Sequence, residues 1–171
     1  SLASVIDYKA FSDVCRLPGD ELVESLTTAY SHWGADDCMI ICRSNKRANI
    51  YNQGIRNMIL YREEELSTGD RIMVVKNNYY WIERLVREQH QAQPLSFIAN
   101  GDIAVVRRVR RTRELYGFRF ADVLLSFPDY DDYEMETTVL LDTLHSESPS
   151  LTREESNRLF EAVMEDYADI S

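Results

Sequence analysis

Three cationic side chains gather where the sequence predicts that a helix begins. Arg43, Lys46 and Arg47 follow the apolar run 38–42 and open a helical pattern that extends from about 46 to 61. The first turn of a helix has unpaired N–H groups and a partial positive charge, so a cation there costs a few tenths to about 1 kcal/mol. An anion such as phosphate would offset this repulsion. The pattern therefore predicts a binding position for a nucleotide or a nucleic acid.

A row of amides continues along the same helix. Three asparagines and one arginine are spaced by 4, 3 and 4 residues, which places them on one face of a helix. Because asparagine is a poor helix former, the row favours hydrogen bonding to a nucleic-acid backbone, a nucleotide or a neighbouring domain; a solvated helix face is the alternative. The row consists of Asn45, Asn49, Asn52 and Arg56. The candidate nucleotide- or DNA-binding residues of this region are Arg43, Ser44, Asn45, Lys46, Arg47, Asn52 and Arg56.

A second basic group lies in the middle of an acidic chain. The net charge is −10, yet residues 66–128 carry 10 basic and 6 acidic side chains, whereas residues 129–171 carry 2 and 13. An arginine strip stands out in the middle segment, formed by Arg107, Arg108, Arg110, Arg111 and Arg113. The strip can contact phosphates, or it can form an exposed strand whose arginines pair with the acidic C-terminal segment. The overall acidity argues against a free-standing nucleic-acid-binding protein.

Other groups give weaker signals. Tyr79, Tyr80 and Trp81 suit either base stacking or core packing. The acidic run 129–136 lacks the glycine of a calcium loop, and the cysteines match no structural zinc spacing. We therefore assign neither catalytic nor metal-binding residues.

The composition excludes several classes of protein. No two of the 6 glycines have the spacing of a GxxxxGK[ST] phosphate loop or a GxGxxG loop. No apolar run is long enough for a transmembrane helix, and no signal-peptide pattern is visible. The 3 cysteines, an odd number, indicate reduced thiols and a cytoplasmic location.

The sequence around the first group of cations predicts helices and a strand that form a piece of an α/β layer. Residues 20–33 predict an amphipathic helix with Asp20 as its N-cap and Gly34 just after it. The uninterrupted apolar run 38–42 predicts a strand buried on both faces, with its cysteine thiols in the core, as in a parallel sheet. The helix at 46–61 completes the order helix, strand, helix.

The elements after residue 66 predict a small antiparallel barrel. Four β-rich runs are expected as strands, and a change of alternation within the third predicts a bulge or bend there. The expected strands are 71–76, 103–111, 116–127 and 135–141. Turns at Gly69-Asp70 and Asn100-Gly101 precede the first two strands.

The expected fold class is therefore α+β. A partial α/β layer at 1–65 precedes a barrel at 66–145 and an acidic C-terminal helix at 146–171. Thr152 and Glu155 form a capping box that opens this last helix. No internal repeat is evident.

Two stretches of the chain occur in an order that a known family shares. They read GDRIMVVKNNY at 69–79 with FIANGDI at 97–103, and IICRSNKRANIYNQGIR at 40–56. The former resembles the GDRVM…N…NGDIG signature of the RecD/Dda-type superfamily-1 DNA helicases, and the latter resembles the strand and helix around motif IV of their second motor domain, of the UvrD-like helicase C-terminal family. The likeness covers roughly residues 36–145, although Ala104 stands where the family often has glycine.

The resemblance implies an ATP-driven translocase on single-stranded DNA, in which an SH3-like barrel is inserted into a RecA-like second motor domain. The Walker A, Walker B and late helicase motifs do not occur in this sequence. ATP and magnesium would therefore bind only in the parent protein, and we expect a piece of the C-terminal half of a helicase without ATPase activity of its own. Proteins of this type are often labelled exonuclease V subunits.

By the same resemblance, the first group of candidates would lie near the inter-domain cleft or the DNA track, and the barrel would brace or guide the strand. The expected DNA-binding residues of the barrel are Arg71, Lys76, Asn77, Tyr79, Arg108 and Arg110. The implied partners are single-stranded DNA and the remaining motor domain of the same protein, with no membrane.

Two other functions stay open. A stand-alone nucleic-acid-binding barrel would bind single strands in a salt-sensitive way. A protein-interaction module would dock a partner through the acidic C-terminal helix and would lose that partner when residues 146–171 are deleted.

Overall fold

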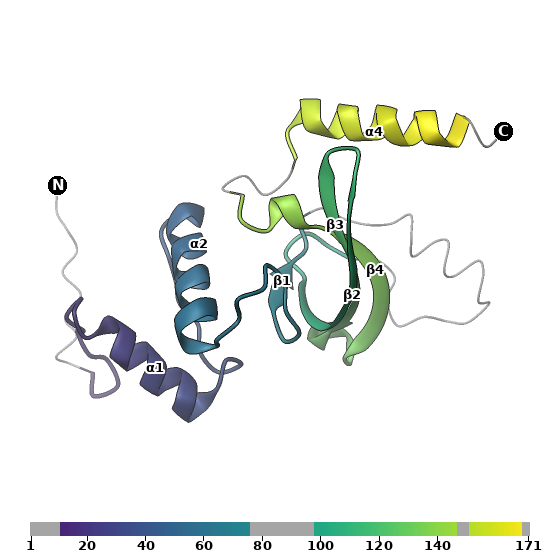
Figure 1. The fold of residues 1–171 in the computed structure, drawn as a ribbon. Coiled ribbons are helices and arrows are strands. Elements are labelled where there is room, and N and C mark those ends of the chain that lie inside the picture. Colours follow the sequence, from purple (N-terminus) through teal and green to yellow (C-terminus); the bar gives the residue numbers. More distant parts are fainter. Residues whose placement is uncertain (1–10, 76–97, 147–150, 169–171) are drawn as a thin grey trace. The chain divides into compact units, whose positions relative to one another are not determined.

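The computed structural model describes residues 11–75, 98–146 and 151–168. The chain divides into two compact units, Ser1–Tyr61 and Arg62–Ser171, which we treat separately. The first contains helices and the second an antiparallel sheet, so the fold class is α+β, as expected (Figure 1). Within the described residues, no helix combines the length and the apolar character needed to cross a bilayer.

Helix α1 spans Leu22–Trp33 and confirms the first expected helix, with a correction at its start. The N-cap is Glu21 rather than Asp20, and no side chain makes a capping hydrogen bond. The Glu21 N–H donates to the carbonyl oxygen of Pro18 at 3.2 Å, so a turn precedes the helix and delays its first residue. Gly34 follows the last turn with φ 84°, as expected of a residue that ends a helix.

The apolar run 38–42 does not form the buried strand that its composition predicts. It has no regular structure, and no backbone hydrogen bond joins it to a residue that the structure describes. Met39 and Ile41 are 86% and 90% exposed, whereas the residues that alternate with them are half-buried. A strand needs a neighbour to pair its backbone groups, and the described part of this unit contains none. Cys38 and Cys42 are accordingly half-buried with free thiols, and they are not the core residues that the sequence predicts.

Helix α2 spans Asn45–Gly54 and continues as the π-helical turn η2 over Ile55–Ile59. The second expected helix is therefore confirmed, with a change to wider turns near its end. Ile55 is the one buried residue among residues 11–61. The described part of the first unit thus has almost no core of its own.

The second unit is built on a four-stranded antiparallel sheet in the order β1-β2-β3-β4 (Figure 1). The strands are β1 Arg71–Met73, β2 Ile103–Leu115, β3 Phe118–Phe127 and β4 Tyr133–Leu140. All four expected strands are present. The short helix η3, Pro128–Tyr130, joins β3 to β4. Leu141 was assigned by its alternation to the last strand but instead begins the short helix η4, Leu141–Thr143.

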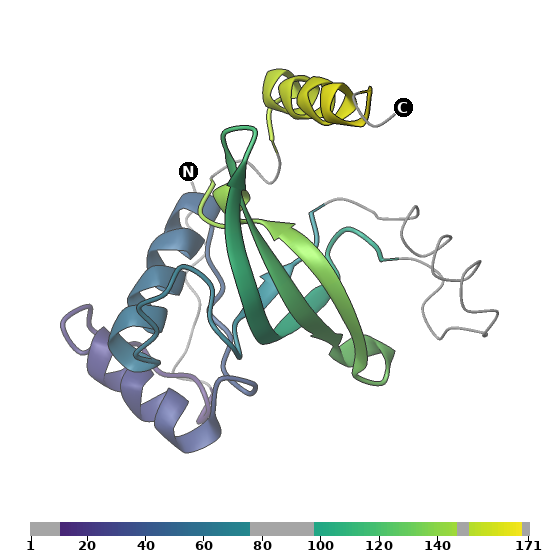
Figure 2. The ribbon, with the colours of Figure 1, turned by 45° about the vertical axis from the view of Figure 1, so that its right-hand side comes forward.

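The sheet curls where β2 is irregular (Figure 2). Its pairing with β3 shifts between Val106 and Arg108 and again between Val109 and Arg111, so β2 has one extra residue at each point. The bulge expected within 116–127 is therefore misplaced, because the extra residues lie on the partner strand. A bulge bends the strand that carries it and increases its twist, so the sheet curls around its core into a half-barrel and not the closed barrel that was expected.

The core of the second unit lies against one face of this sheet. Val106, Val123 and Phe127 are almost completely buried, and they cluster with Leu66 and Ile98 from outside the four strands. Buried and half-buried positions alternate over residues 103–106 and 121–125, as in a sheet with a single core face, whereas Leu125, Ser126 and Phe127 are buried in succession.

Helix α4 spans Arg153–Ala168 and begins with the expected capping box. The Thr152 N–H donates to the Glu155 carboxylate at 2.8 Å, and the Glu155 N–H donates to the Thr152 hydroxyl at 3.2 Å. The Arg158 guanidinium lies 5.1 Å from the centre of the Phe118 ring, so the helix contacts the sheet near the β2–β3 turn.

Two Gly-Asp turns make the same hydrogen bonds at the starts of β1 and β2. The Asp70 carboxylate accepts the Ser67 N–H at 2.8 Å, and the Asp102 carboxylate accepts the Ala99 N–H at 2.7 Å. The glycine before each aspartate has a positive φ, 85° in the first turn and 95° in the second, which only glycine adopts without strain.

The repetition extends to the pairing of the two strands. The Val106 N–H donates to the carbonyl oxygen of Asp70 at 2.8 Å, and the Val74 N–H donates to that of Asp102 at 2.9 Å. The stretches GDRIMV and GDIAVV thus play equivalent parts at opposite ends of the β1–β2 pair, although they are too short to form an internal repeat of whole elements.

Candidate functional site

The cations of the first candidate group lie at the start of α2. Arg43 directly precedes the Ser44 cap, and Lys46 and Arg47 lie in a first turn that contains no acidic side chain. All three are exposed. The Ser44 Oγ accepts the Arg47 N–H at 3.3 Å and satisfies one free donor of this turn. The arrangement presents positive charge to solvent and suits a surface phosphate.

The amide row of α2 is only partly accessible. Asn45 and Asn52 are exposed, whereas Asn49 and Arg56 are partly covered. Arg56 lies in η2, beyond the regular turns of α2, and both partly covered residues interact within the chain. Asn45 interacts within the chain as well, so Asn52 is the exposed amide of the row that is best placed to hydrogen-bond a ligand.

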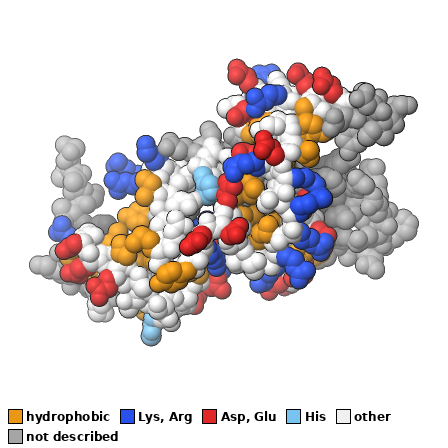
Figure 3. Space-filling model, viewed as in Figure 1, with side chains coloured by type: hydrophobic (Ala, Val, Ile, Leu, Met, Phe, Trp, Pro, Cys, Tyr) orange, Lys and Arg blue, Asp and Glu red, His pale blue; other side chains and the backbone are white. Residues whose placement is uncertain are grey.

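The arginine strip of β2 is mostly neutralised by carboxylates of the second unit. Figure 3 shows basic and acidic side chains interspersed over the sheet. The ion pairs are Arg107–Asp132 at 3.5 Å, Arg110–Glu136, Arg111–Asp122 at 3.0 Å and Arg113–Asp122 at 3.0 Å. Arg108 is exposed and forms no ion pair with a residue of the described ranges. The geometry thus favours the interpretation that the strip pairs with acidic side chains, two of which belong to the C-terminal acidic segment.

Asp122 on β3 is the centre of this pairing. Its carboxylate accepts a hydrogen bond from the Thr138 hydroxyl at 2.7 Å and lies 3.0 Å from the guanidinium groups of Arg111 and Arg113. The hydrogen bond from Thr138, followed by the two arginines, holds the pKa of Asp122 below its usual range. Asp122, Thr138 and Arg110 line a groove of about 580 Å³, and its mixed charge suits a zwitterionic or neutral polar ligand better than a polyanion.

Acidification is expected to release this pairing. The pKa of Asp122 is lower in the folded than in the unfolded chain, so its contribution to stability is present above the unfolded pKa and is lost as the pH falls through the folded pKa. An NMR titration of the Asp122 carboxyl is expected to give a midpoint below that of an ordinary aspartate. In Thr138→Val the midpoint is expected to move up, because the largest cause of the shift is removed. An unshifted midpoint in the unmodified chain would contradict the described hydrogen bonds.

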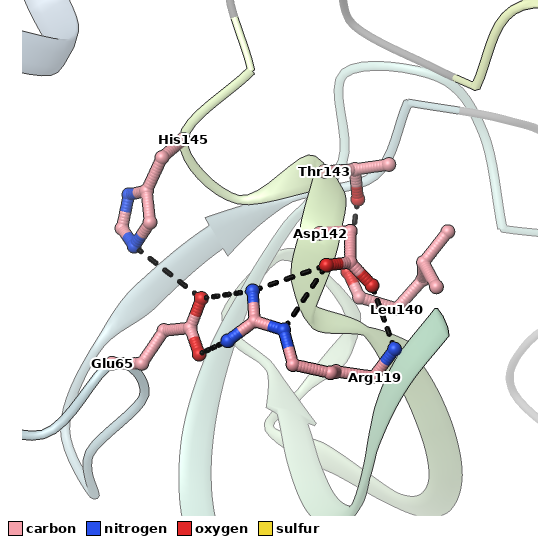
Figure 4. Close-up of polar contacts among 6 residues, drawn as sticks. All are labelled: Glu65, Arg119, Leu140, Asp142, Thr143 and His145. Atoms are coloured by element: carbon pink, nitrogen blue, oxygen red, sulfur yellow. Dashed lines mark hydrogen bonds and ion pairs between the residues drawn. The ribbon is translucent and has the colours of Figure 1, made fainter. Parts of the chain in front are cut away.

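A second ion-pair cluster surrounds Arg119 at the start of β3, and no local sequence pattern reveals it (Figure 4). The guanidinium donates to both Glu65 oxygens at 2.7 and 3.0 Å and to Asp142 at 3.1 Å, and the backbone N–H donates to Asp142 at 2.7 Å. The hydrogen bonds that Arg119 donates to Glu65 and then to Asp142 raise the pKa of Arg119 further above its usual range. His145 lies 4.0 Å from Glu65. The cluster ties the segment before β1 to the segment after β4, which is a structural role.

The residues expected to form the DNA-binding surface of the barrel are not all brought together. Arg71 is exposed on the edge strand β1, whereas Arg108 and Arg110 lie in the part of β2 beyond its pairing with β1. The remaining members lie outside the described residues, as do two neighbouring aromatics; these residues are Lys76, Asn77, Tyr79, Tyr80 and Trp81. Within the described ranges, no group of three or more His, Cys, Asp or Glu side chains is placed to hold a metal ion.

Comparison with protein-family models, with curated proteins and with solved structures finds no match for this chain. Its function is therefore inferred from its own residues and their arrangement.

Proposed function

We propose that this chain is part of a RecD/Dda-type superfamily-1 DNA helicase. In this proposal, residues 1–65 are a piece of its RecA-like second motor domain, and the curled sheet is the SH3-like barrel inserted into that domain. The chain contributes contacts to single-stranded DNA, while ATP and magnesium bind to other parts of the same helicase.

The observation that carries the proposal is the placement of the two helicase-like stretches. The stretch at 40–56 ends in α2, with its cations exposed at the helix start. The stretch around residues 69 and 101 builds the two Gly-Asp turns and the β1–β2 pair of a curled antiparallel sheet. The helix of the first stretch and the strands of the second are thus present, whereas the strand expected at 38–42 is not formed.

A lack of core in the first unit also supports the proposal. Only Ile55 is buried among residues 11–61, and the apolar side chains of Met39 and Ile41 face solvent. Folded domains bury most of their large apolar side chains, so such a unit is typical of one part of a larger layer.

Exposure and pairing select three candidate phosphate contacts, which are Arg43 and Arg47 at the start of α2 in the first unit and Arg108 on β2 in the second. All three are exposed, whereas Arg110 would first have to leave Glu136. Their role is electrostatic, because contacts to phosphates position a strand without reading its sequence.

Binding of a fluorescein-labelled oligothymidylate at low salt tests this function. We expect the full chain to bind and the double variant Arg43→Ala/Arg47→Ala to bind roughly tenfold more weakly, because phosphate contacts are lost. Arg111→Ala is the matched control, since Arg111 is exposed but paired with Asp122, and its effect is expected to stay below about twofold.

Two results would contradict the proposal. One is failure of the full chain to bind a single strand. The other is unchanged binding by the double variant together with complete loss in Arg108→Ala, which would favour a stand-alone nucleic-acid-binding barrel.

A further inference from the structure

Phe118 on β3 is buried outside the main core of the second unit. Its side chain is 3% exposed, yet it does not belong to the cluster of buried residues around Phe127. It lies near the tip of the β2–β3 hairpin, because β4 pairs with β3 only from Phe120 onward. The start of α4 supplies part of its cover. The Arg158 guanidinium lies 5.1 Å from the ring centre, and Leu151 lines the same small pocket of about 190 Å³.

Helix α4 packs only loosely against the rest of its unit. None of its side chains that the structure describes is buried, and Phe160 is 65% exposed. A helix that buries so little apolar surface gains little stability from packing, so it is among the parts of a fold that open most readily. The cation–π contact between Arg158 and Phe118 is therefore a main contact that keeps this helix in place.

The hairpin and the helix differ in charge. Residues 103–127 carry 6 basic and 2 acidic side chains, whereas α4 carries 2 and 5. Carboxylates pair with several of these arginines, but Arg108 forms no ion pair with a residue of the described ranges. The helix thus places negative charge beside a hairpin that would otherwise attract a polyanion.

Opening of the helix would change what the hairpin presents to solvent. The Phe118 ring would become an exposed aromatic on an arginine-rich hairpin, and the negative charge of α4 would move away. An exposed aromatic ring stacks a base, and nearby cations attract the phosphates, which is how proteins bind single strands without reading their sequence.

We propose that α4 is an autoinhibitory cover that competes with a single strand for Phe118. In the closed chain Arg158 occupies the face of the ring, and in the open chain a base of the strand stacks there. Because a strand that binds only the open form shifts the chain toward it, the helix and the strand exclude each other. This inference rests on the proposed function, to which it adds a stacking position in the sheet unit and its control by the C-terminal helix.

Replacement of Arg158 separates the cover from a simple charge effect. Arg158→Ala removes a cation, so electrostatics alone would weaken the binding of a polyanion. The cover predicts the opposite sign. The full chain with Arg158→Ala is expected to bind oligothymidylate about threefold more tightly, because loss of the cation–π contact releases α4. Arg153→Ala, at an exposed position of the same helix, is the matched control and is expected to bind no more tightly than the unmodified chain.

Variants of Phe118 in the Arg158→Ala chain test the stacking position. Arg158→Ala/Phe118→Tyr keeps a ring and is expected to keep the tighter binding. Arg158→Ala/Phe118→Leu keeps an apolar side chain without a ring and is expected to lose the gain. Circular dichroism checks that each variant is folded.

Hydrogen exchange of the α4 amides gives a readout that needs no DNA. We expect exchange about threefold faster in Arg158→Ala than in Arg153→Ala. Equal exchange in the two variants, or binding by Arg158→Ala that is no tighter than that of the unmodified chain, would overturn this inference alone. Failure of every chain to bind the oligothymidylate would contradict the proposed function and this inference together.

Discussion

Phe127→Ala is expected to lower the free energy of unfolding of the sheet unit by about 3–5 kcal/mol. Phe127 ends β3 and is 1% exposed within the core of the second unit. Its ring also meets that of Tyr130 edge to face, with 6.4 Å between the ring centres. Truncation removes these contacts and leaves a cavity that the curled sheet cannot fully close.

Chemical denaturation followed by circular dichroism measures this loss. Phe160→Ala is the matched control, because the same truncation on α4 affects a side chain that is 65% exposed. Its effect is expected to stay within about 0.5 kcal/mol. Equal effects of the two truncations would show that Phe127 is not a core residue.

Asp70→Ala is expected to lower the free energy of unfolding by about 2–4 kcal/mol, the second largest of the expected effects. Asp70 is 5% exposed, and its carboxylate accepts hydrogen bonds from the Arg62 guanidinium and the Ser67 N–H, both at 2.8 Å. Its removal leaves the N–H and the partly buried cation without their acceptor. The first Gly-Asp turn would then lose the contacts that fix the start of β1.

Two further variants separate the contributions at this turn. Asp70→Asn keeps an oxygen that can accept the Ser67 N–H but loses the ion pair, so its cost is expected to lie between zero and that of Asp70→Ala. Asp102→Ala removes the equivalent carboxylate of the second turn, which accepts from Ala99 and Tyr130 rather than from an arginine. We expect a smaller loss there, and a larger loss at Asp102 than at Asp70 would contradict the assigned role of Arg62.

Much of the fold follows from local patterns in the sequence. The apolar spacing predicts α1 and α2, the β-rich runs predict all four strands, and Thr152 with Glu155 marks the start of α4. These signals work because each depends on residues a few positions apart. Asp20 fails as a cap for an equally local reason, since the turn at Pro18 delays the helix by one residue.

The features that sequence reasoning misses depend on distant residues or on missing neighbours. The run 38–42 has the composition of a buried strand, yet a strand forms only when a partner accepts its hydrogen bonds. The change of alternation on β3 is real, but the extra residues lie on β2, its partner. Arg119 joins Glu65 to Asp142, which lie 54 and 23 positions away, so no local pattern could reveal the cluster.

The sequence predicts where the candidate cations lie in the chain's elements, but only partly which of them are accessible to a ligand. The sequence places cations at a helix start, and the structure has Arg43 and Arg47 exposed there. The sequence does not reveal that Asp122 and Glu136 form ion pairs with three of the arginines on β2, because the register of three strands sets those contacts. The second group is therefore a weaker candidate for phosphate binding than the first.

The salt dependence of single-strand binding by the full chain tests the central claim most directly. If Arg43 and Arg47 contact phosphates, the logarithm of the binding constant should fall linearly with the logarithm of salt concentration, with a slope of roughly −0.7 for each phosphate contacted. These two contacts contribute about −1.4 to the slope of the full chain, so we predict a shallower slope for Arg43→Ala/Arg47→Ala. Binding that does not change with salt, or an unchanged slope in the double variant, would contradict the claim that these arginines hold a DNA strand.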